Sequence, residues 1–393
     1  MKRTLFILAA VAIAFAACKD NNEPSVTNNY YGDNSTGGKS ISCNPTSKEV
    51  PATGETFIVD VTSAAAWTVS TDQPSWVKID PNTSLGDAYV AITVASGAGG
   101  RAKVKFVNAS GAKAELSIKR GYILAGALPG KFSVSSTKQV QFSMGNLQYH
   151  AKNNVWRFAE HQFDTIGANN KNISATYDGW IDLFGWGTSG YNSKYPYMTS
   201  TTASDYGNGT NDIAGTDYDW GKYNPISNGG NAVNQWRTLT YAEWSYLFHG
   251  RTNYEKLFAL GSVDGINGTI LLPDDWILPE GAIFNPSTEN GMHWKSGGYD
   301  YINEASDANN FADNTYLTSD STWQVMEEAG AVFLPVTGYR YSTSPEQLGT
   351  GGYYWSATMD GTYWAHRMSF YTYQLYLNST DNRYYGFAVR LVK

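Results

Sequence analysis

The final stretch of the chain, from Gly351 to Lys393, has the residue types that suit the binding of another molecule. Tyrosine occupies 8 of the 41 positions from 353 to 393, against 28 of all 393 residues, and lysine and glutamate are absent from 351 to 392. Tyrosine combines a large, rigid contact surface with a polar tip, and serine and asparagine adapt their hydrogen bonds to a partner. We interpret this stretch as a binding face, with an aromatic-rich sheet that packs on itself as the alternative.

Two sets of residues share this stretch. Apolar residues such as Met368, Phe370, Leu377, Phe387 and Val389 suit positions that face a core. Because neighbouring residues of a strand point to opposite sides, the residues between them are expected to point outward. The predicted ligand contacts are Tyr353, Asp360, Thr362, Tyr363, His366, Ser369, Tyr371, Tyr373, Tyr376, Asp381, Tyr384 and Tyr385.

Groups that could perform catalysis are scattered and lack the spacing that chemistry requires. The five histidines are His150, His161, His249, His293 and His366. None lies in an HExxH motif or another metal-ligand spacing, and no serine lies in a G-x-S-x-G motif. The paired carboxylates Glu327 and Glu328 are expected on a solvated helix face, whereas a glycosidase needs two carboxylates across a cleft. We therefore predict a protein that is not an enzyme.

A structural calcium ion is an alternative to the prediction of no cofactor. The segment from Asp205 to Asp219 is rich in aspartate and asparagine, but its spacing departs from the calcium-loop pattern. Such loops more often form turns in which the side chain bonds to its own backbone.

The first residues resemble a targeting signal. Lys2 and Arg3 precede an apolar run, 5–16, that is too short to cross a bilayer. Small residues lead to Cys18, and this arrangement resembles the lipobox of bacterial lipoproteins, with an ordinary secretory signal as the alternative. The resemblance implies cleavage before Cys18 and a lipid on its thiol. The charged residues 19–23 resemble the tag that directs lipoproteins of the Bacteroidetes to the outer face of the outer membrane.

Charge and cysteine content limit the possible partners and the means of stabilisation. The net charge is −7, and loss of Lys2 and Arg3 makes it −9, without a basic cluster; this argues against a nucleic-acid partner. After Cys18, Cys43 is the sole remaining cysteine, so a mature chain has no intramolecular disulfide and depends on its core.

Residues 41–121 have the pattern of a β-sandwich. The segments 56–61, 89–94, 102–107 and 114–118 alternate polar and apolar residues and are separated by turn sequences. Trp67 and Trp76 with their flanking residues resemble the BACON domain, an immunoglobulin-like module of gut Bacteroidetes. The resemblance implies a spacer or a carbohydrate-binding module. We expect both tryptophans to lie in the core and the domain to act as a stalk.

Residues 122–393 contain two predicted helices among strands. The first covers 240–249, with Thr240 and Glu243 as a capping box and Gly250 at its end; the second covers 321–329, before a buried strand at 331–336. Short strands are predicted before them, at 131–134, 140–142, 147–149 and 155–158. The Gly-, Asn- and Tyr-rich stretch 167–234 is expected to be irregular, with aromatic anchors at Trp180, Phe184, Trp186 and Trp220.

Three segments of this region, 237–246, 352–356 and 386–392, resemble formylglycine-generating-enzyme-type domains, which have a C-type lectin-like fold. The copper-binding cysteine pair of the enzyme has no counterpart, because the region lacks cysteine. The tail also resembles the variable proteins of diversity-generating retroelements. Their adenine-directed mutation yields Tyr, Ser, Asp, His, Asn and Thr but not Lys or Glu. A fixed member of the same family remains an alternative.

The predicted protein is an α+β, β-rich lipoprotein with four parts: a signal peptide at 1–17, a flexible tether at 18–40, an immunoglobulin-like sandwich at 41–121 and a C-type lectin-like domain at 122–393. It is expected at the cell surface, bound to the outer membrane through lipid, with an extracellular protein or glycan as its ligand. A structural surface or fimbrial component is the alternative, and an enzyme on the formylglycine-generating scaffold is a weaker one.

Overall fold

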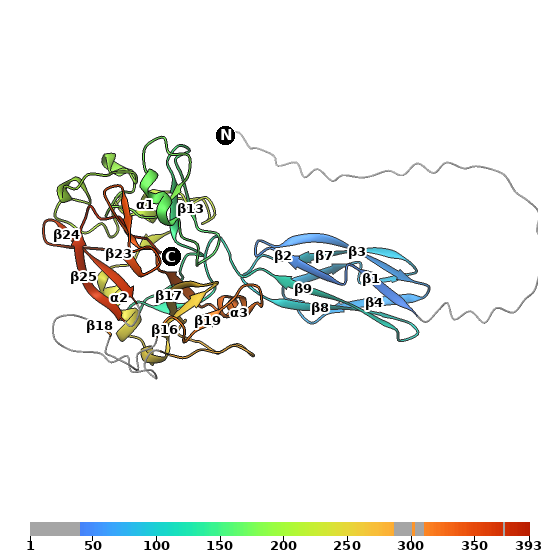
Figure 1. Cartoon of the computed structure of the whole chain (residues 1–393). Coiled ribbons are helices and arrows are strands. Elements are labelled where there is room, and N and C mark those ends of the chain that lie inside the picture. The colour runs from blue at the N-terminus through green and yellow to red at the C-terminus, as the bar shows by residue number, and fades with distance from the viewer. Residues whose placement is uncertain (1–39, 287–300, 303–309, 372–373) are drawn as a thin grey trace, which may run out of the picture.

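The computed structural model describes residues 40–286, 301–302, 310–371 and 374–393, and strands in several sheets dominate them. Strands β1 to β9 form an elongated N-terminal unit, and the later elements form a rounder C-terminal unit beside it (Figure 1). No helix within the described ranges is long and apolar enough to cross a membrane. Cys18 and the expected signal peptide lie outside the described residues.

Two sheets enclose one core in the N-terminal unit. The first has the order β1 (Ile41–Asn44), β3 (Glu55–Ser63), β7 (Ala88–Val94) and β5 (Val77–Asp80). The second has the order β2 (Ser47–Val50), β9 (Lys113–Arg120), β8 (Arg101–Asn108), β4 (Ala66–Thr71) and β6 (Thr83–Leu85). The four alternating segments predicted from the sequence all lie in these strands, and most of their apolar residues face the shared core, whereas Ile58 and Tyr89 are exposed.

The two tryptophans of this unit occupy different environments. Trp67 is 2% exposed and packs edge to face on Phe106, as predicted for a core residue. Trp76 packs at the border of the core and is partly exposed, so its full burial is not confirmed. The Arg120 guanidinium lies over the Trp76 ring, 4.3 Å from its centroid, and covers one face of the ring.

Small sheets and three α-helices build the described part of the C-terminal unit. Its larger sheets have the orders β19 (Thr315–Tyr316), β16 (Phe258–Val263), β17 (Ile266–Leu271), β20 (Val332–Pro335) and β18 (Tyr301–Ile302), β25 (Gln374–Asn382), β24 (Trp364–Tyr371), β23 (Gly351–Asp360). A smaller three-stranded sheet has the order β13 (Val155–Phe158), β12 (Leu147–His150) and β14 (Trp180–Ile181). Three strand pairs complete the described sheets: β10 (Phe132–Ser133) with β11 (Gln139–Val140), β15 (Arg237–Thr238) with β26 (Leu391–Val392), and β21 (Tyr339–Tyr341) with β22 (Ser344–Glu346). The helices are α1 (Trp220–Tyr223), α2 (Tyr241–His249) and α3 (Thr322–Glu328).

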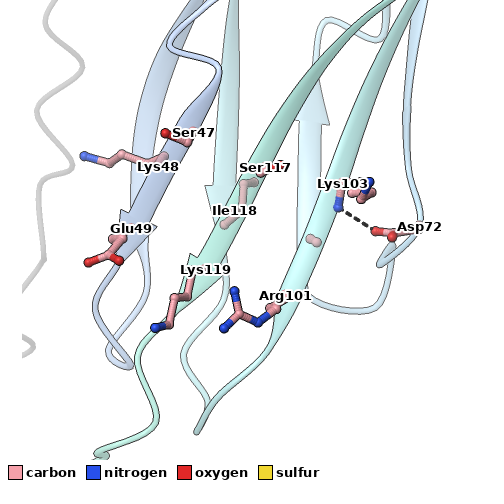
Figure 2. Close-up of a pocket in the computed structure, with 10 residues that line it drawn as sticks. Ser47, Lys48, Glu49, Asp72, Arg101, Lys103, Ser117, Ile118 and Lys119 are labelled. Atoms are coloured by element: carbon pink, nitrogen blue, oxygen red, sulfur yellow. Dashed lines mark hydrogen bonds between the residues drawn. The ribbon is translucent and has the colours of Figure 1, made fainter. Parts of the chain in front are cut away.

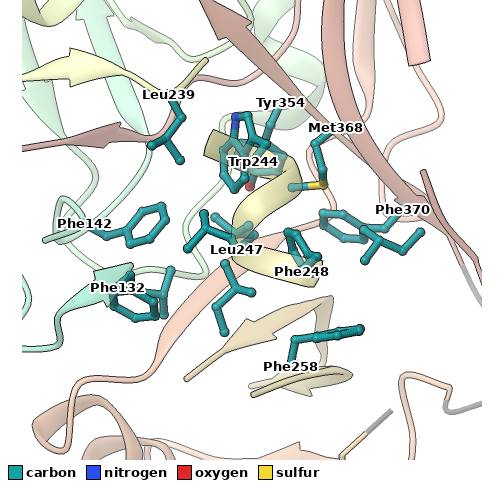
Figure 3. Close-up of a cluster of buried hydrophobic side chains, with 14 of the residues drawn as sticks. Phe132, Phe142, Leu239, Trp244, Leu247, Phe248, Phe258, Tyr354, Met368 and Phe370 are labelled. Carbon is teal, nitrogen blue, oxygen red and sulfur yellow. The ribbon is translucent and has the colours of Figure 1, made fainter. Parts of the chain in front are cut away.

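Helix α2 supports the sheet that contains the tyrosine-rich strands. Thr240 and Glu243 form the predicted capping box, and Gly250 is the C-cap. The buried face of the helix, Trp244, Leu247 and Phe248, packs against Tyr354, Met368 and Phe370 of β23 and β24 (Figure 3). One face of the sheet is therefore fixed by a continuous apolar core.

A second core covers the opposite face of β23 and β24. Segment 167–234 contributes to it from short turns and α1, and its predicted anchors Phe184, Trp186 and Trp220 are fully buried. Trp180 is partly exposed and lies under the Arg157 guanidinium, 3.9 Å from the ring centroid, so it packs at the surface rather than as a buried anchor.

Helix α3 joins the two units. The Glu328 carboxylate lies 2.6 Å from Lys119 Nζ and 3.6 Å from an Arg101 Nη of the N-terminal unit, and the Tyr122 hydroxyl donates to Glu327. The expectation that these glutamates lie on a solvated helix face is therefore wrong. Cations of the N-terminal unit hold Glu328 at the junction, and the hydroxyl of Tyr122, just after that unit, holds Glu327.

Candidate functional site

A cavity of about 180 Å³ opens on the face of β23–β25 that lies opposite helix α2. We call it the tyrosine pocket. Strands β21, β23, β24 and β25 and the segments that follow β22 and β25 each contribute to it. Its lining residues are Tyr339, Gln347, Tyr353, Arg367, Tyr371, Asp381, Tyr385 and Phe387.

Strand alternation explains why these side chains meet. In β24, Met368 and Phe370 face the α2 core, so Arg367, Ser369 and Tyr371 point to the other side. A bulge between β24 and β25 realigns the pair, so that Ser369 lies opposite Tyr376. The tyrosine pocket is thus formed by the alternate residues of an otherwise buried sheet.

Aromatic rings form the floor and walls of the pocket. Phe387 and Tyr353 lie at the floor, 1% and 3% exposed, with ring centroids 5.2 Å apart in a stacked arrangement. Tyr339 and Tyr371 stand edge-on to Tyr353 at 5.2 and 5.6 Å. Tyr385 stacks near Phe387 at 5.9 Å. These contacts fix ring orientations, so the cavity is largely pre-formed.

Tyrosyl hydroxyls within the pocket are paired with neighbouring groups. Tyr353 and Tyr371 hydroxyls lie 2.5 Å apart, the Tyr353 hydroxyl donates to Gln347, and the Tyr339 hydroxyl donates to Glu346 at 2.6 Å. Burial, followed by the hydrogen bond to Tyr371, raises the pKa of Tyr353. Burial, followed by the hydrogen bond to Glu346, raises the pKa of Tyr339. These hydroxyls therefore stay neutral at physiological pH and act as hydrogen-bonding groups.

One ion pair lies within this aromatic wall. Arg367 Nε donates to Asp381 Oδ2 at 2.5 Å, and an Nη donates to Ser369. The guanidinium lies over the Tyr353 and Phe387 rings, 5.1 and 5.6 Å from their centroids. Stacking on two rings and pairing with a carboxylate hold it in one orientation.

Seven of the predicted contacts lie in or beside the pocket, but not all of these are exposed. Tyr371, Asp381 and Tyr385 line it, and Tyr376 and Tyr384 contact Tyr371 and Tyr385 at its edge. Tyr353 and Ser369 are buried, so the prediction that they point into solvent is wrong. The second core covers their face of the sheet, which leaves Tyr353 accessible at the pocket floor alone.

The remaining predicted contacts lie elsewhere. Asp360, Thr362 and Tyr363 are exposed at the turn that joins β23 to β24. His366 lies on the α2 side of the sheet, where its ring stacks on Tyr241 at 4.6 Å and burial lowers the pKa of the imidazole. His366 is therefore not part of the pocket, because its side chain lies on the same side of β24 as those of Met368 and Phe370. Tyr373 lies outside the described residues.

Four lining residues were not among the predicted contacts: Tyr339, Gln347, Arg367 and Phe387. Arg367 had a usable signal, since it precedes Ser369 and Tyr371 by two and four positions along one strand. Phe387 was assigned to the scaffold, and its burial agrees with this, although its ring also reaches the pocket floor. Tyr339 lies in β21 and Gln347 directly follows β22, and the sequence did not suggest the hairpin of these two strands.

A larger hollow of about 450 Å³ lies on the N-terminal unit, along β2, β9 and β8 (Figure 2). Its four cationic side chains each have a carboxylate neighbour: Lys48 with Glu55, Lys103 with Glu115, and Lys119 and Arg101 with Glu328. Each cation of this hollow is therefore already paired with a carboxylate outside its lining, and we do not assign it as the binding site.

Metal-ligand geometry does not appear within the described ranges, where no three His, Cys, Asp or Glu side chains converge. In the segment considered for calcium, Asp219 accepts hydrogen bonds from the Thr238 backbone and hydroxyl and from Gly221. Asp212 accepts from the Met359 backbone at 2.9 Å. These two carboxylates join separate parts of the fold.

Comparison with known proteins leaves the chain without an assigned family: no family model matches it, and no curated protein does. A Bacteroides ovatus GH5 xyloglucanase in complex with a XXXG heptasaccharide is 23% identical, with a TM-score of 0.20, over 21% of this chain and 19% of that chain. Domains 4 and 5 of the S-layer protein SbsC are 15% identical, with a TM-score of 0.18, over 21% and 51%. A PapD-like domain of human CEP192 is 12% identical, with a TM-score of 0.19, over 26% and 98%.

The chain thus spans about a fifth of the length of the xyloglucanase that it matches. TM-scores of this size carry no argument about fold or function.

Proposed function

We propose that this protein is a surface lipoprotein that binds an extracellular ligand, a protein or a glycan, through the tyrosine pocket and the tyrosines at its edge. The observation that carries the proposal is the pocket. Four tyrosines and an oriented arginine–aspartate pair come together from six separate segments around an open cavity. Concave sites with aromatic walls and a few fixed polar groups are the usual form of a ligand site.

Surface display is proposed from the sequence and from the arrangement of the elements. The lipobox-like residues before Cys18 supply the anchor, with 18–40 as a tether, 41–121 as an immunoglobulin-like stalk and 122–393 as a C-type lectin-like head. Strands β24 and β25 lie on the side of the C-terminal unit away from the N-terminal unit (Figure 1). A ligand outside the cell would then meet the pocket at the far end of the molecule.

Diversification of the tail by a retroelement forms part of the proposal. Tyr371, Asp381 and Tyr385 are residue types that adenine-directed mutation produces, and all three line the pocket. A near-copy of the coding repeat beside a reverse transcriptase gene in the neighbouring DNA is the expected finding. Its absence would leave a fixed binding face.

Ligand binding is tested by removing the pocket tyrosines without disturbing the cores. The chain without residues 1–17 is applied to arrays of extracellular glycans and secreted proteins, beside a Tyr371→Ser/Tyr385→Ser double variant. Both tyrosines are partly exposed, so the melting temperature should change little. Binding to the captured molecule should fall at least about tenfold, because central aromatics dominate such interfaces.

Tyr89→Ser is the matched control, since Tyr89 is 73% exposed on the N-terminal unit. It should leave binding unchanged. Equal binding by the wild type and the double variant would contradict the proposal and favour a structural surface component.

A further inference from the structure

The size of the tyrosine pocket limits what can enter it. Pockets that hold drug-sized ligands usually have volumes of about 300–1,000 Å³. At about 180 Å³ this cavity accepts a single ring-sized group, such as one residue of a longer ligand. The rest of the ligand would lie across the edge of the pocket, against Tyr376 and Tyr384.

Charge within the pocket is balanced. Arg367 and Asp381 are the charged residues among its lining, and they are bonded to each other at 2.5 Å. The nearby Glu346 carboxylate accepts from the Tyr339 hydroxyl. An anionic group would compete with Asp381 for the guanidinium, and a cationic group would be repelled by it. A neutral group enters without breaking the pair.

Unused hydrogen-bonding atoms remain beside this pair. Among the described residues, no hydrogen-bond partner is present for Arg367 Nη2, Asp381 Oδ1 or Gln347 Nε2. The lining therefore offers both donors and acceptors to a bound group. An apolar side chain would cover these atoms and leave them unpaired, which is unfavourable. Hydroxyl groups can pair with both the donor atoms and the acceptor atoms, because each hydroxyl donates and accepts hydrogen bonds.

The aromatic side of the pocket complements a saturated ring. Tyr385 and Phe387 lie nearly parallel, with 13° between their planes, and Tyr339 stands at 80° to Tyr385. Aromatic faces carry negative electrostatic potential, which attracts the weakly positive hydrogens of C–H groups beside hydroxyls. A ring with C–H groups on one face and hydroxyls at its edge satisfies both sides of the pocket.

We propose that the group bound in the tyrosine pocket is one uncharged pyranose residue of a glycan. This inference rests on the proposed function and specifies its ligand class. The sugar hydroxyls pair with Arg367, Asp381 and Gln347, and the sugar ring packs on the partly exposed Tyr385.

Saturation-transfer NMR on the chain without residues 1–17 tests the proposal. The probes are methyl glycosides of glucose, galactose, mannose and xylose, together with methyl glucuronide, glucosamine and tetrahydropyran. At least one neutral glycoside should receive saturation more strongly than the charged sugars. Tetrahydropyran should not, because it lacks the hydroxyls that pair with the polar side. Gln347→Ala should weaken the neutral glycoside about tenfold, and Tyr89→Ser should leave it unchanged.

Asp381→Asn provides a second, directional test. It removes the negative charge and leaves Arg367 unbalanced, so preference should shift from the neutral glycoside towards methyl glucuronide. A wild type that prefers a charged sugar, or an Asp381→Asn variant with unchanged preference, would overturn the assignment. If no glycoside binds, but displayed peptides are captured in a way that Tyr371→Ser/Tyr385→Ser abolishes, the sugar assignment is wrong and the proposed binding function stands. If that capture also fails, both are wrong.

Discussion

Gln347 has a left-handed backbone conformation, with φ of 50°, at the edge of the tyrosine pocket. Residues other than glycine pay about 1–2 kcal/mol for this conformation. Its side chain accepts the hydrogen bond of the Tyr353 hydroxyl. A strained residue in direct contact with the pocket floor suggests that the position is kept for its side chain rather than for the turn.

Gln347→Gly separates these two roles. Glycine relieves the backbone strain but loses a hydrogen bond worth about 1 kcal/mol, so stability should stay within about 1 kcal/mol of the wild type. Ligand binding should weaken about tenfold, because one donor and the support of Tyr353 are lost. A urea titration and a binding titration on the same protein measure both. Parallel losses of stability and binding would show that the residue acts through the fold.

Asp182 gives the C-terminal unit a defined pH dependence. Its carboxylate accepts from the Ile166 backbone and the Asn170 side chain, and burial raises its pKa to about 6. The folded state thus holds a proton over a pH range in which the unfolded state, with a pKa of about 3.9, has released it. Stabilisation by this group is fully present below pH of about 4 and is lost as pH rises through about 6.

Asp182→Asn should remove this dependence. The free energy of unfolding of the wild type, relative to the variant, should fall by about 3 kcal/mol between pH 4 and pH 7. Urea titrations at the two pH values measure the difference, with Asp80→Asn, at an exposed position, as the control. Wild type and variant curves that stay parallel across this range would contradict the assignment.

At the scale of elements, local patterns predicted local structure. The capping box at Thr240 and Glu243, and the stripe Trp244, Leu247 and Phe248, specify α2 from residues within two turns of one another. The side of β24 that faces the α2 core likewise follows from the positions of Met368 and Phe370. Such features depend on residues that are close in the sequence, so a single sequence is sufficient to predict them.

What covers each face of a strand could not be predicted in this way. Tyr353 and Ser369 lie on the face of the sheet that was expected to point outward, yet both are buried. The second core, which includes Phe387 and the much earlier residues Phe184 and Trp186, covers that face. Tyr339 and Gln347 reach the pocket through a hairpin with weak sequence signals. Both outcomes depend on long-range packing, which alternation does not encode.

Phe387 connects the second core to the pocket. Its ring lies 4.3 Å from Trp355 and 5.2 Å from Tyr353, and the residue is 1% exposed. Phe387→Ala should lower the free energy of unfolding by about 3–5 kcal/mol, because it leaves a cavity between these rings. Tyr371→Ser, at a partly exposed position, should cost much less. Denaturant titrations of both variants compare the losses, and similar losses would show that Tyr371 belongs to the core.

At the scale of the whole molecule, the junction decides how the pocket is presented. Glu328 bonds to Lys119 and Arg101, and Tyr122 bonds to Glu327, which also accepts from the buried Gln162 side chain. These contacts tie the last strands of the N-terminal unit to the interior of the C-terminal unit. The two units should therefore keep one relative orientation, as the proposed stalk role of the first unit requires.

Glu328→Ala tests this rigidity. It removes both ion pairs across the junction. Each of these partly exposed pairs contributes only about 1 kcal/mol or less to the free energy of unfolding. The melting temperature should therefore change little. Distances between spin labels placed on β3 and β17 should broaden from a narrow distribution, because the two units lose their main ionic contact. The wild type should show part of this broadening at 1 M salt, where exposed charges are screened within about 3 Å.

Glu115→Ala is the matched control, since it breaks the Lys103 pair on the same sheet but outside the junction, and it should leave the distances narrow. A Glu328→Ala variant with unchanged distances would show that the ion pairs do not fix the orientation of the two units and have no part in presenting the pocket.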